Sequence, residues 1–195
     1  MNTKLLLPNQ RYEEIKREVF DLLEECPDIT YPIEPQKVAR NMLYVLRPYS
    51  TLDLEGYIEA TNISDDAFSR PEINPQTGMY EYVIYFNDYR NTPGRIAWSI
   101  AHEIGHIYLG HHDLPEDKSQ ELEANFFAKY LMAPPPLIHT ANCHNYRDIA
   151  RQFKLSQQAA KYAYNYYYSW LHKGPKDYTY NELKLINTFG QCFAV

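Results

Sequence analysis

The sequence contains few cysteines and no long apolar run, and both shortages exclude classes of protein. Its cysteines, Cys26, Cys143 and Cys192, are widely spaced and form no Cys-x-x-Cys pair. They therefore predict neither a disulfide framework nor a thiolate zinc site. No segment approaches the roughly 20 apolar residues that span a bilayer, and the apolar run at residues 5–7 is too short for a signal peptide. We therefore expect a cytoplasmic protein with reduced thiols.

Basic residues are also fewer than acidic residues. The chain has 19 Lys and Arg against 25 Asp and Glu, a net charge of −6, so its overall field attracts neither nucleic acid nor an anionic membrane. Its 195 residues are enough for one sizeable core, and we expect a single domain, 1–195. The 19 tyrosines are more typical of half-buried packing surfaces than of a binding platform.

The segment from Ala97 to His111 contains one His-Glu-x-x-His motif, formed by His102, Glu103 and His106. On a helix, residues four apart differ by about 40° around the axis, so the two histidines can hold one metal ion between them. Neutral imidazoles are good zinc ligands, and Glu103 can accept a proton from a metal-bound water as that water attacks a carbonyl. The motif therefore predicts one Zn²⁺ per chain with a general base beside it.

The residues around the motif predict a mostly buried helix. Thr92 is a candidate N-cap, and Pro93 suits the first helical position. Isoleucines recur at spacings of four and three on one face: Ile96, Ile100, Ile104 and Ile107. The alternative is a purely structural helix with two hydrogen-bonded histidines and a salt-bridged Glu. The shared register of the three polar residues favours the metal site.

A catalytic zinc site needs a third protein ligand, and a second helix predicted from about residue 119 to 132 offers two candidates. Glu121 and Glu123 are about 200° apart on a helix, so only one of them can face the ion. We favour Glu121, with Glu123 as the alternative, because Asn125 shares the face of Glu121 and can hydrogen-bond a metal-bound histidine. His111 and His112 do not continue the four-residue spacing and are interpreted as cleft-rim or capping residues.

The rest of the chain predicts a mainly helical α+β fold, with a small antiparallel sheet packed beside the metal-binding helix. We expect N-terminal helices within residues 11–47, the sheet and zinc-site core within 56–136, and a C-terminal helical segment within 137–195. Weak alternation at 57–61 and the aromatic run at 80–86 predict strands. The last strand leads into the motif helix, and an exposed strand edge there can accept an extended peptide.

Residues 148–160 resemble the first helix, turn and second-helix start of a helix-turn-helix unit, with Ser156 as N-cap. A DNA-binding interpretation would use basic side chains for phosphate contacts: Arg147, Arg151, Lys154 and Lys161. The predicted second helix, however, offers glutamines and one lysine but no arginine, and the chain is acidic. Two packed helices are therefore favoured over a DNA-binding unit.

The segment 101–106, the downstream Glu-x-Glu-Ala-Asn-x-Phe-Ala and the segment 131–134 resemble the ImmA/IrrE family of bacterial and phage metallopeptidases. Residues 84–87 before the motif helix and Arg95 at its start are also similar to that family. The resemblance implies a zincin-like, gluzincin-like site. It also implies proteolysis of a regulatory protein, such as a helix-turn-helix repressor of a phage or mobile element, and hence an antirepressor role. Some relatives serve stress-response regulation, which leaves the substrate open.

We therefore predict a zinc-dependent metallopeptidase in which the two motif histidines and Glu121 bind zinc and Glu103 is the general base. An oxyanion donor is also needed, and His139, His144 or a tyrosine can supply it. The alternative function is a regulatory protein that binds DNA or a repressor and keeps the metal site as a structural clamp.

Overall fold

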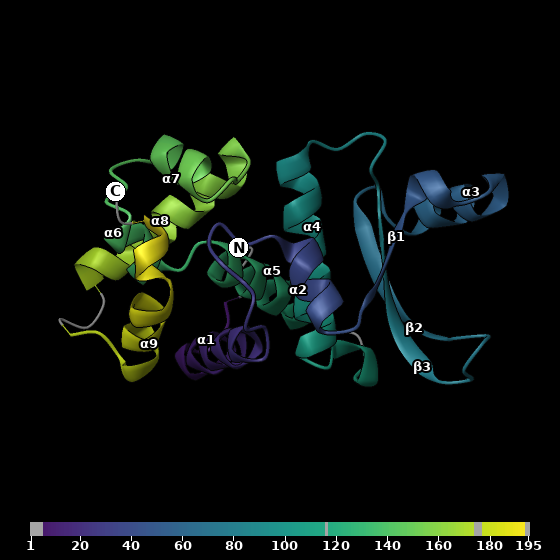
Figure 1. Ribbon diagram of the computed structural model, residues 1–195, viewed down its shortest axis with the longest axis horizontal. Helices are drawn as coiled ribbons and strands as arrows, with labels where there is room; N and C mark the ends of the chain where they lie inside the picture. Colours follow the sequence, from purple (N-terminus) through teal and green to yellow (C-terminus); the bar gives the residue numbers. More distant parts are fainter. Residues whose placement is uncertain (1–5, 116, 174–176, 194–195) are drawn as a thin grey trace, which may run out of the picture.

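The computed structural model describes residues 6–115, 117–173 and 177–193, and Figure 1 shows the arrangement of their helices and strands. The sheet and α3 lie at one end of the molecule, α6 to α9 lie at the other, and α4 and α5 lie between them. The helices are α1 (Asn9–Glu24), α2 (Pro35–Asn41), α3 (Leu54–Ile63), α4 (Pro93–Tyr108), α5 (Lys118–Met132), α6 (Pro135–Thr140), α7 (Tyr146–Gln152), α8 (Gln157–Lys173) and α9 (Tyr180–Phe189), and the strands are β1 (Val45–Pro48), β2 (Ala67–Ile73) and β3 (Tyr80–Phe86).

The prediction of a mainly helical α+β fold with a small sheet is confirmed, although the sheet is mixed rather than purely antiparallel. Its strand order is β1-β3-β2, in which β2 pairs antiparallel with β3 and β1 pairs parallel with it. Most of β1 was expected to be helical, since N-terminal helices were predicted within residues 11–47. Helix α2 stops at Asn41 because Leu43 adopts a left-handed conformation (φ 60°), and the Tyr44 N–H then donates to the Ala39 carbonyl at 2.8 Å.

One strand prediction was wrong, and one strand was missed. Residues 57–61 belong to α3, whose start is fixed by Asp53: its side chain accepts a hydrogen bond from the Gly56 N–H at 2.8 Å. This cap overrides the weak alternation that suggested a strand. The strand β2 was not predicted, and Pro71 lies within it. A proline is tolerated there because β2 is an edge strand, which needs hydrogen-bond donors on one side only.

Helix α4, which carries the His-Glu-x-x-His motif, begins at Pro93 as predicted, and its isoleucine face is turned inward, with Ile100 and Ile104 fully buried. α4 packs closely on α5 at Gly105, where an added Cβ would lie 3.2 Å from the ring of Phe127. The absence of that Cβ lets the two helices approach, and this approach brings the polar side chains of both helices together.

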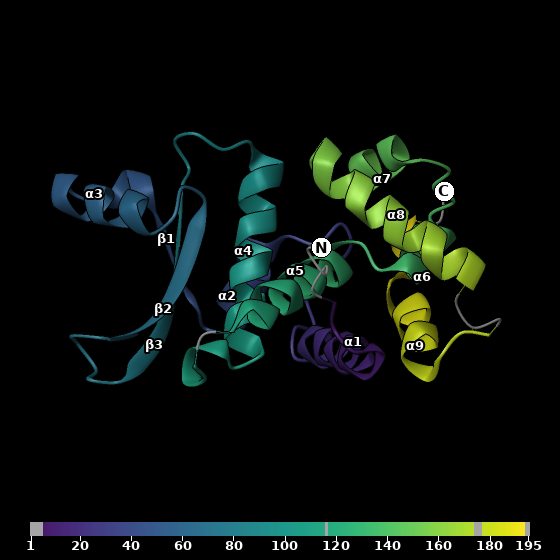
Figure 2. The same ribbon diagram turned by 180° about the vertical axis from the view of Figure 1, so that it is seen from behind.

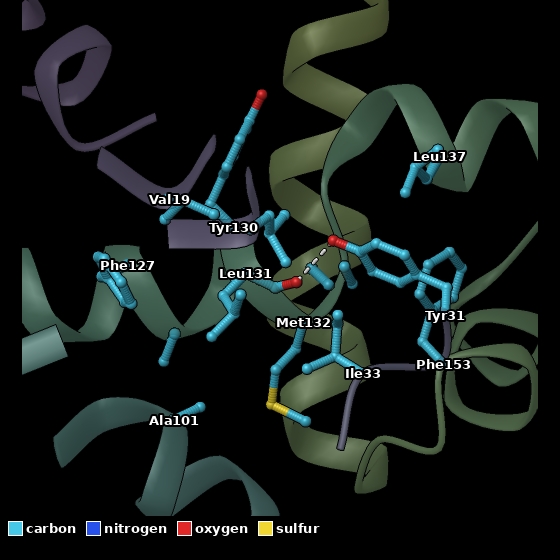
Figure 3. Close-up of a cluster of buried hydrophobic side chains, with 14 of the residues drawn as sticks. Val19, Tyr31, Ile33, Ala101, Phe127, Tyr130, Leu131, Met132, Leu137 and Phe153 are labelled. Atoms are coloured by element: carbon cyan, nitrogen blue, oxygen red, sulfur yellow. Dashed lines mark hydrogen bonds between the residues drawn. The ribbon is translucent and has the colours of Figure 1, made fainter. Parts of the chain in front are cut away.

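The main hydrophobic core joins side chains of α1, α2 and α4 to α9 with Ile84 of β3. Ala60 of α3 packs in a second, smaller cluster with Tyr49, Val83 and Tyr85. Figure 3 shows the part of the main core around the end of α5, where the Tyr31 hydroxyl donates to the Leu131 carbonyl at 2.8 Å. Val19 of α1 and Ala101 of α4 pack in the same region. Across the ranges that the structure describes, no helix is both long and apolar enough to cross a membrane.

Candidate metal centre

Three side chains converge where α4 meets α5. The Nε2 atoms of His102 and His106 are 3.0 Å apart, the His102 Nε2 is 3.5 Å from Glu121 Oε2, and the His106 Nε2 is 3.3 Å from Glu121 Oε1. The helical spacing of four places both histidines on one face of α4, and Glu121 reaches them from the first turn of α5. One ligand atom from each residue lies within 4.8 Å of the others, so this group can hold a metal ion.

The donor set and its spacing fit zinc. A tetrahedral zinc ion with bonds of about 2.0–2.1 Å places its ligand atoms about 3.3 Å apart. Here the two histidine nitrogens are 3.0 Å apart, and each lies 3.3–3.5 Å from one of the two carboxylate oxygens of Glu121. Two imidazole nitrogens and one carboxylate form the donor set of a catalytic rather than a structural zinc site, with a fourth position left for water.

The electrostatics of the group also favour a metal ligand set. Burial, followed by the adjacent His102, lowers the pKa of His106 to about 4, so its ring is neutral at pH 7 and has a lone pair to offer. The hydrogen bond from His102 lowers the pKa of Glu121 below its ordinary value, and this carboxyl is therefore ionised. Neutral imidazoles and an ionised carboxylate are the ligand forms that zinc requires.

Glu123 faces away from this group, as the helical geometry of α5 predicted, and makes contacts of its own with His111 and Arg11. Its Oε2 lies 3.2 Å from His111 Nε2 and 2.5 Å from the Arg11 guanidinium. The other ring nitrogen of His111, Nδ1, lies 3.0 Å from His106 Nδ1. A chain of contacts thus runs from α1 through Glu123 and His111 to the back of a metal-facing histidine.

The direction of this chain follows from the side of the ring that His106 turns to the metal group. Because its Nε2 faces Glu121, a neutral His106 with Nε2 as the ligand atom carries its proton on Nδ1 and donates it to His111. His111 then carries its own proton on Nε2 and donates to Glu123, whose charge is balanced by Arg11. His111 reaches this position because Gly110, with φ 71°, ends the helix and turns the chain back.

Glu103 is buried, with 8% of its surface exposed, and it lies next to the first histidine of the motif. Its Oε2 accepts a hydrogen bond from the Ser69 hydroxyl of β2 at 2.7 Å, and the same hydroxyl lies 3.0 Å from His112 Nε2. Burial raises the pKa of Glu103, while His102 and Ser69 act against that rise. A carboxylate in this setting is a stronger base than an exposed one.

The raised pKa of Glu103 predicts a pH-dependent stability of the metal-free protein. A carboxyl whose pKa is higher in the folded than in the unfolded chain favours folding below its unfolded value, and this contribution is lost as the pH rises through the folded value. Metal-free Glu103→Gln protein should therefore melt at a higher temperature than metal-free wild type at pH 7, and the difference should shrink towards pH 4. Thermal melting at a series of pH values measures this, and a variant that is less stable at pH 7 would contradict it.

The structure places the remaining predicted site residues elsewhere. The Asn125 amide donates to the backbone carbonyl of Glu121 at 2.7 Å instead of reaching a histidine. His139 lies on α6, where its Nδ1 is 2.9 Å from the Tyr167 hydroxyl, and the His144 N–H bonds Asp148. Both belong to the α6–α8 end of the molecule, which Figure 2 shows on the far side of α5 from the sheet, so we do not retain them as oxyanion donors.

Comparison with known families agrees with the geometry of this centre. The sequence model of the peptidase M78 family, described as an IrrE N-terminal-like domain, matches residues 57–165, which is more than half of the chain. The matched range includes both motif histidines, Glu103 and the start of α5. The comparison with curated proteins gave no match. The chain belongs to the ImmA/IrrE family, whose members are metallopeptidase-like proteins.

Proposed function

We propose that the protein is a zinc-dependent endopeptidase whose metal ligands are His102, His106 and Glu121. The observation that carries this proposal is that Glu121 of α5 meets His102 and His106 of α4, with the buried Glu103 beside His102 on the same helix. Zinc bound there would act as a Lewis acid towards the scissile carbonyl and would lower the pKa of a bound water. We also propose one domain, because one core cluster contains side chains of α1, α2 and α4 to α9, and β3 contributes both to it and to the smaller cluster under α3.

In this proposal Glu103 transfers the proton, and neighbouring side chains hold its carboxylate in position. Glu103 takes the proton of the attacking water and later returns it to the leaving amine. The Ser69 hydroxyl, which donates to Glu103 Oε2 at 2.7 Å, holds the carboxylate in one orientation. Because the Ser69 proton goes to Glu103, the His112 Nε2–H donates to the Ser69 oxygen at 3.0 Å and holds that hydroxyl in place.

The proposed substrate is a regulatory protein, with a helix-turn-helix repressor of a phage or mobile element as the first candidate. The resemblance of the sequence motifs to the ImmA/IrrE family supports this choice of substrate. The position of β2 supports binding of the substrate as an extended peptide. β2 is an edge strand, and Ser69 on it contacts Glu103, so a peptide added to that edge passes the general base. Candidate repressors incubated with the protein, with and without a chelator, test the proposal. Defined fragments that appear equally with Glu103→Gln or with chelator present would contradict it.

DNA binding is not favoured by the position of α8. Lys154 (φ 52°) gives α7 and α8 the left-handed turn of a helix-turn-helix pair. A reading helix of that kind inserts its N-terminal residues into the major groove. Here the start of α8 lies against the start of α4, since a Cβ on Gly94 would come within 3.0 Å of the Ser156 backbone nitrogen. The end of the helix that would read DNA is therefore turned towards the metal-binding helix.

The contacts behind His106 predict two variants with weakened metal binding. Removing the imidazole in His111→Ala, or the carboxylate in Glu123→Ala, leaves the His106 Nδ1 proton without an oriented acceptor, and zinc affinity should fall about 10–100-fold. Glu123→Gln keeps an acceptor oxygen and should lose less. Zinc titration of the metal-free proteins measures the affinities. Asn125→Ala is the matched control on the same helix, because its amide contacts the backbone of Glu121 only, and equal losses in all three alanine variants would argue against the assignment.

A further inference from the structure

A large groove lies between the two metal-binding helices and α8, and the motif chemistry does not account for it. Its volume is about 990 Å³, and side chains of α4, α5 and α8 line it. Figure 2 shows α5 between α4 and α8, and we call the α5 part of the lining the floor and the α4 and α8 parts the walls. Aromatic rings make up much of the lining: Tyr12, Trp98, Phe126, Tyr162 and Tyr166.

The groove continues the helix faces that carry the metal ligands. On α4, Trp98 lies four residues before His102 and shares its face. On α5, Asn125 and Lys129 follow Glu121 by four and eight residues, about 40° and 80° around the axis, so the groove side of α5 adjoins the side that carries that ligand. The floor and one wall therefore lead directly away from the proposed zinc site.

The edge strand leads to the same groove. β2 begins at Ala67, and the preceding residue, Asp66, lines the groove together with Arg95. A peptide that extends along β2 past Ser69 and beyond the start of the strand therefore arrives at this lining. The opposite wall is a face of α8, and that face is exposed at Tyr162 and Asn165. The second helix of the helix-turn-helix-like pair thus contributes to a groove beside the metal centre.

The charged side chains of the lining leave an excess of positive charge. Asp66 and Arg95 neutralise each other through two hydrogen bonds of 2.7 and 2.6 Å. Lys129 has no carboxylate within ion-pair distance in the described part of the chain, and its Nζ lies over the rings of Phe126 and Tyr166 at 4.8 and 4.2 Å. A groove with a net cation in a chain of net charge −6 is complementary to an acidic segment.

We propose that this groove binds the protein substrate on one side of the scissile bond, and that Lys129 selects a substrate carboxylate flanked by apolar side chains. The proposal rests on the peptidase function above. Lys129 is a specificity residue, remote from the reacting atoms. Burial, followed by nearby Lys16, lowers the pKa of Lys129 to about 8. Burial destabilises the protonated, cationic form of Lys129, and a substrate carboxylate beside the amine would stabilise that form.

The distance along α5 predicts where the acidic residue stands. Eight residues separate Glu121 from Lys129, and a rise of about 1.5 Å per residue puts them about 12 Å apart along the helix. An extended chain covers about 3.3–3.6 Å per residue. The selected carboxylate therefore lies about three or four residues from the scissile bond.

A synthetic library of random-sequence dodecapeptides tests this selection, with cleavage sites identified by mass spectrometry. Zinc-loaded wild type should show Asp and Glu enriched about threefold or more at one position three or four residues from the cut, as for a partly exposed ion pair. Lys129→Met should lose the enrichment, and Lys129→Glu should replace it with Lys and Arg. Lys161→Met is the matched control, since Lys161 is exposed on α8 outside the groove lining, and it should keep the wild-type profile.

The outcomes separate this inference from the function on which it rests. If both Lys129 variants keep the wild-type profile, the groove assignment is wrong and the peptidase stands. If wild type and Glu103→Gln both leave the library uncut, the peptidase function fails and the groove assignment falls with it. Zinc content and thermal melting of each variant exclude loss of the fold as the cause of a changed profile.

A steric variant tests the groove without altering its charge. Asn165→Trp adds a large ring to the α8 wall, away from the zinc ligands. It should raise the KM of the best library peptide about tenfold or more, with zinc content and kcat near wild type, as expected for lost substrate binding. An unchanged KM would overturn the assignment. A wild-type dimer that becomes monomeric in Asn165→Trp would also overturn it, because a second copy of the chain would then be the occupant.

Discussion

Glu103→Gln protein is expected to bind zinc like wild type and to cleave a confirmed peptide at least about 10²–10⁴-fold more slowly. The amide matches the carboxylate in size and can still accept the Ser69 hydrogen bond, so the local packing is preserved. It cannot take a proton from water, and that step is the one the carboxylate is placed to perform. The measurement is kcat on the best library peptide, with zinc content determined on the same preparation.

Ser69→Ala provides the matched comparison for this experiment. It removes the hydroxyl that orients the carboxylate but leaves Glu103 as a base, so its effect on kcat should be clearly smaller than that of Glu103→Gln. Cleavage by Glu103→Gln at the wild-type rate would exclude Glu103 as the general base. The endopeptidase proposal would then need another proton acceptor near the metal centre.

The parts of the site that follow helical geometry were predictable from sequence. A spacing of four puts His102 and His106 on one face whatever the rest of the fold does, and the approximately 200° between Glu121 and Glu123 allows only one of them to face that pair. The structure has Glu121 within 3.3–3.5 Å of both histidines. The α4 boundaries were likewise set by local signals, with Pro93 at its first position.

The partners of these residues could not be predicted, because tertiary packing alone brings them together. Ser69 is on β2, far from Glu103 in sequence, and its pattern of neighbours gave no sign of a contact. His111 was interpreted as a rim residue because its spacing from His106 is not helical. The left-handed Gly110 turns it back onto His106, and a glycine just after a helix is the one local signal for such a turn.

Helices and strands were predictable where the apolar residues recur at a regular spacing over several turns or residues, and not where that pattern is short or irregular. The isoleucine face of α4 and the aromatic run of β3 gave correct elements, since each pattern extends over several residues that become buried. α3 and β1 were missed because a single local feature determines each of them. Asp53 caps the start of α3, and the left-handed conformation of Leu43 ends α2 and directs the chain into β1.

Loss of any proposed ligand is expected to remove zinc from the protein. Wild type purified without added metal should contain about one zinc per chain, and His102→Ala, His106→Ala and Glu121→Ala should each lose most of it. The loss in affinity should exceed the about 10–100-fold expected for groups behind the ligands, because two remaining donors leave the ion under-coordinated. Elemental analysis gives the content, and zinc titration of each metal-free variant gives the affinity.

Glu123→Ala separates the ligand from its neighbour in this series. Glu121 has 66% of its side-chain surface exposed and makes its contacts with the two histidines, whereas Glu123 is held by Arg11 and His111. Glu121→Ala should therefore cost more zinc affinity than Glu123→Ala while disturbing the fold less, which thermal melting of the metal-free proteins would show. If Glu123→Ala were the variant that empties the site and Glu121→Ala the one that stays loaded, α5 would have to be rotated by about 200°. Glu123, and not Glu121, would then be the third ligand.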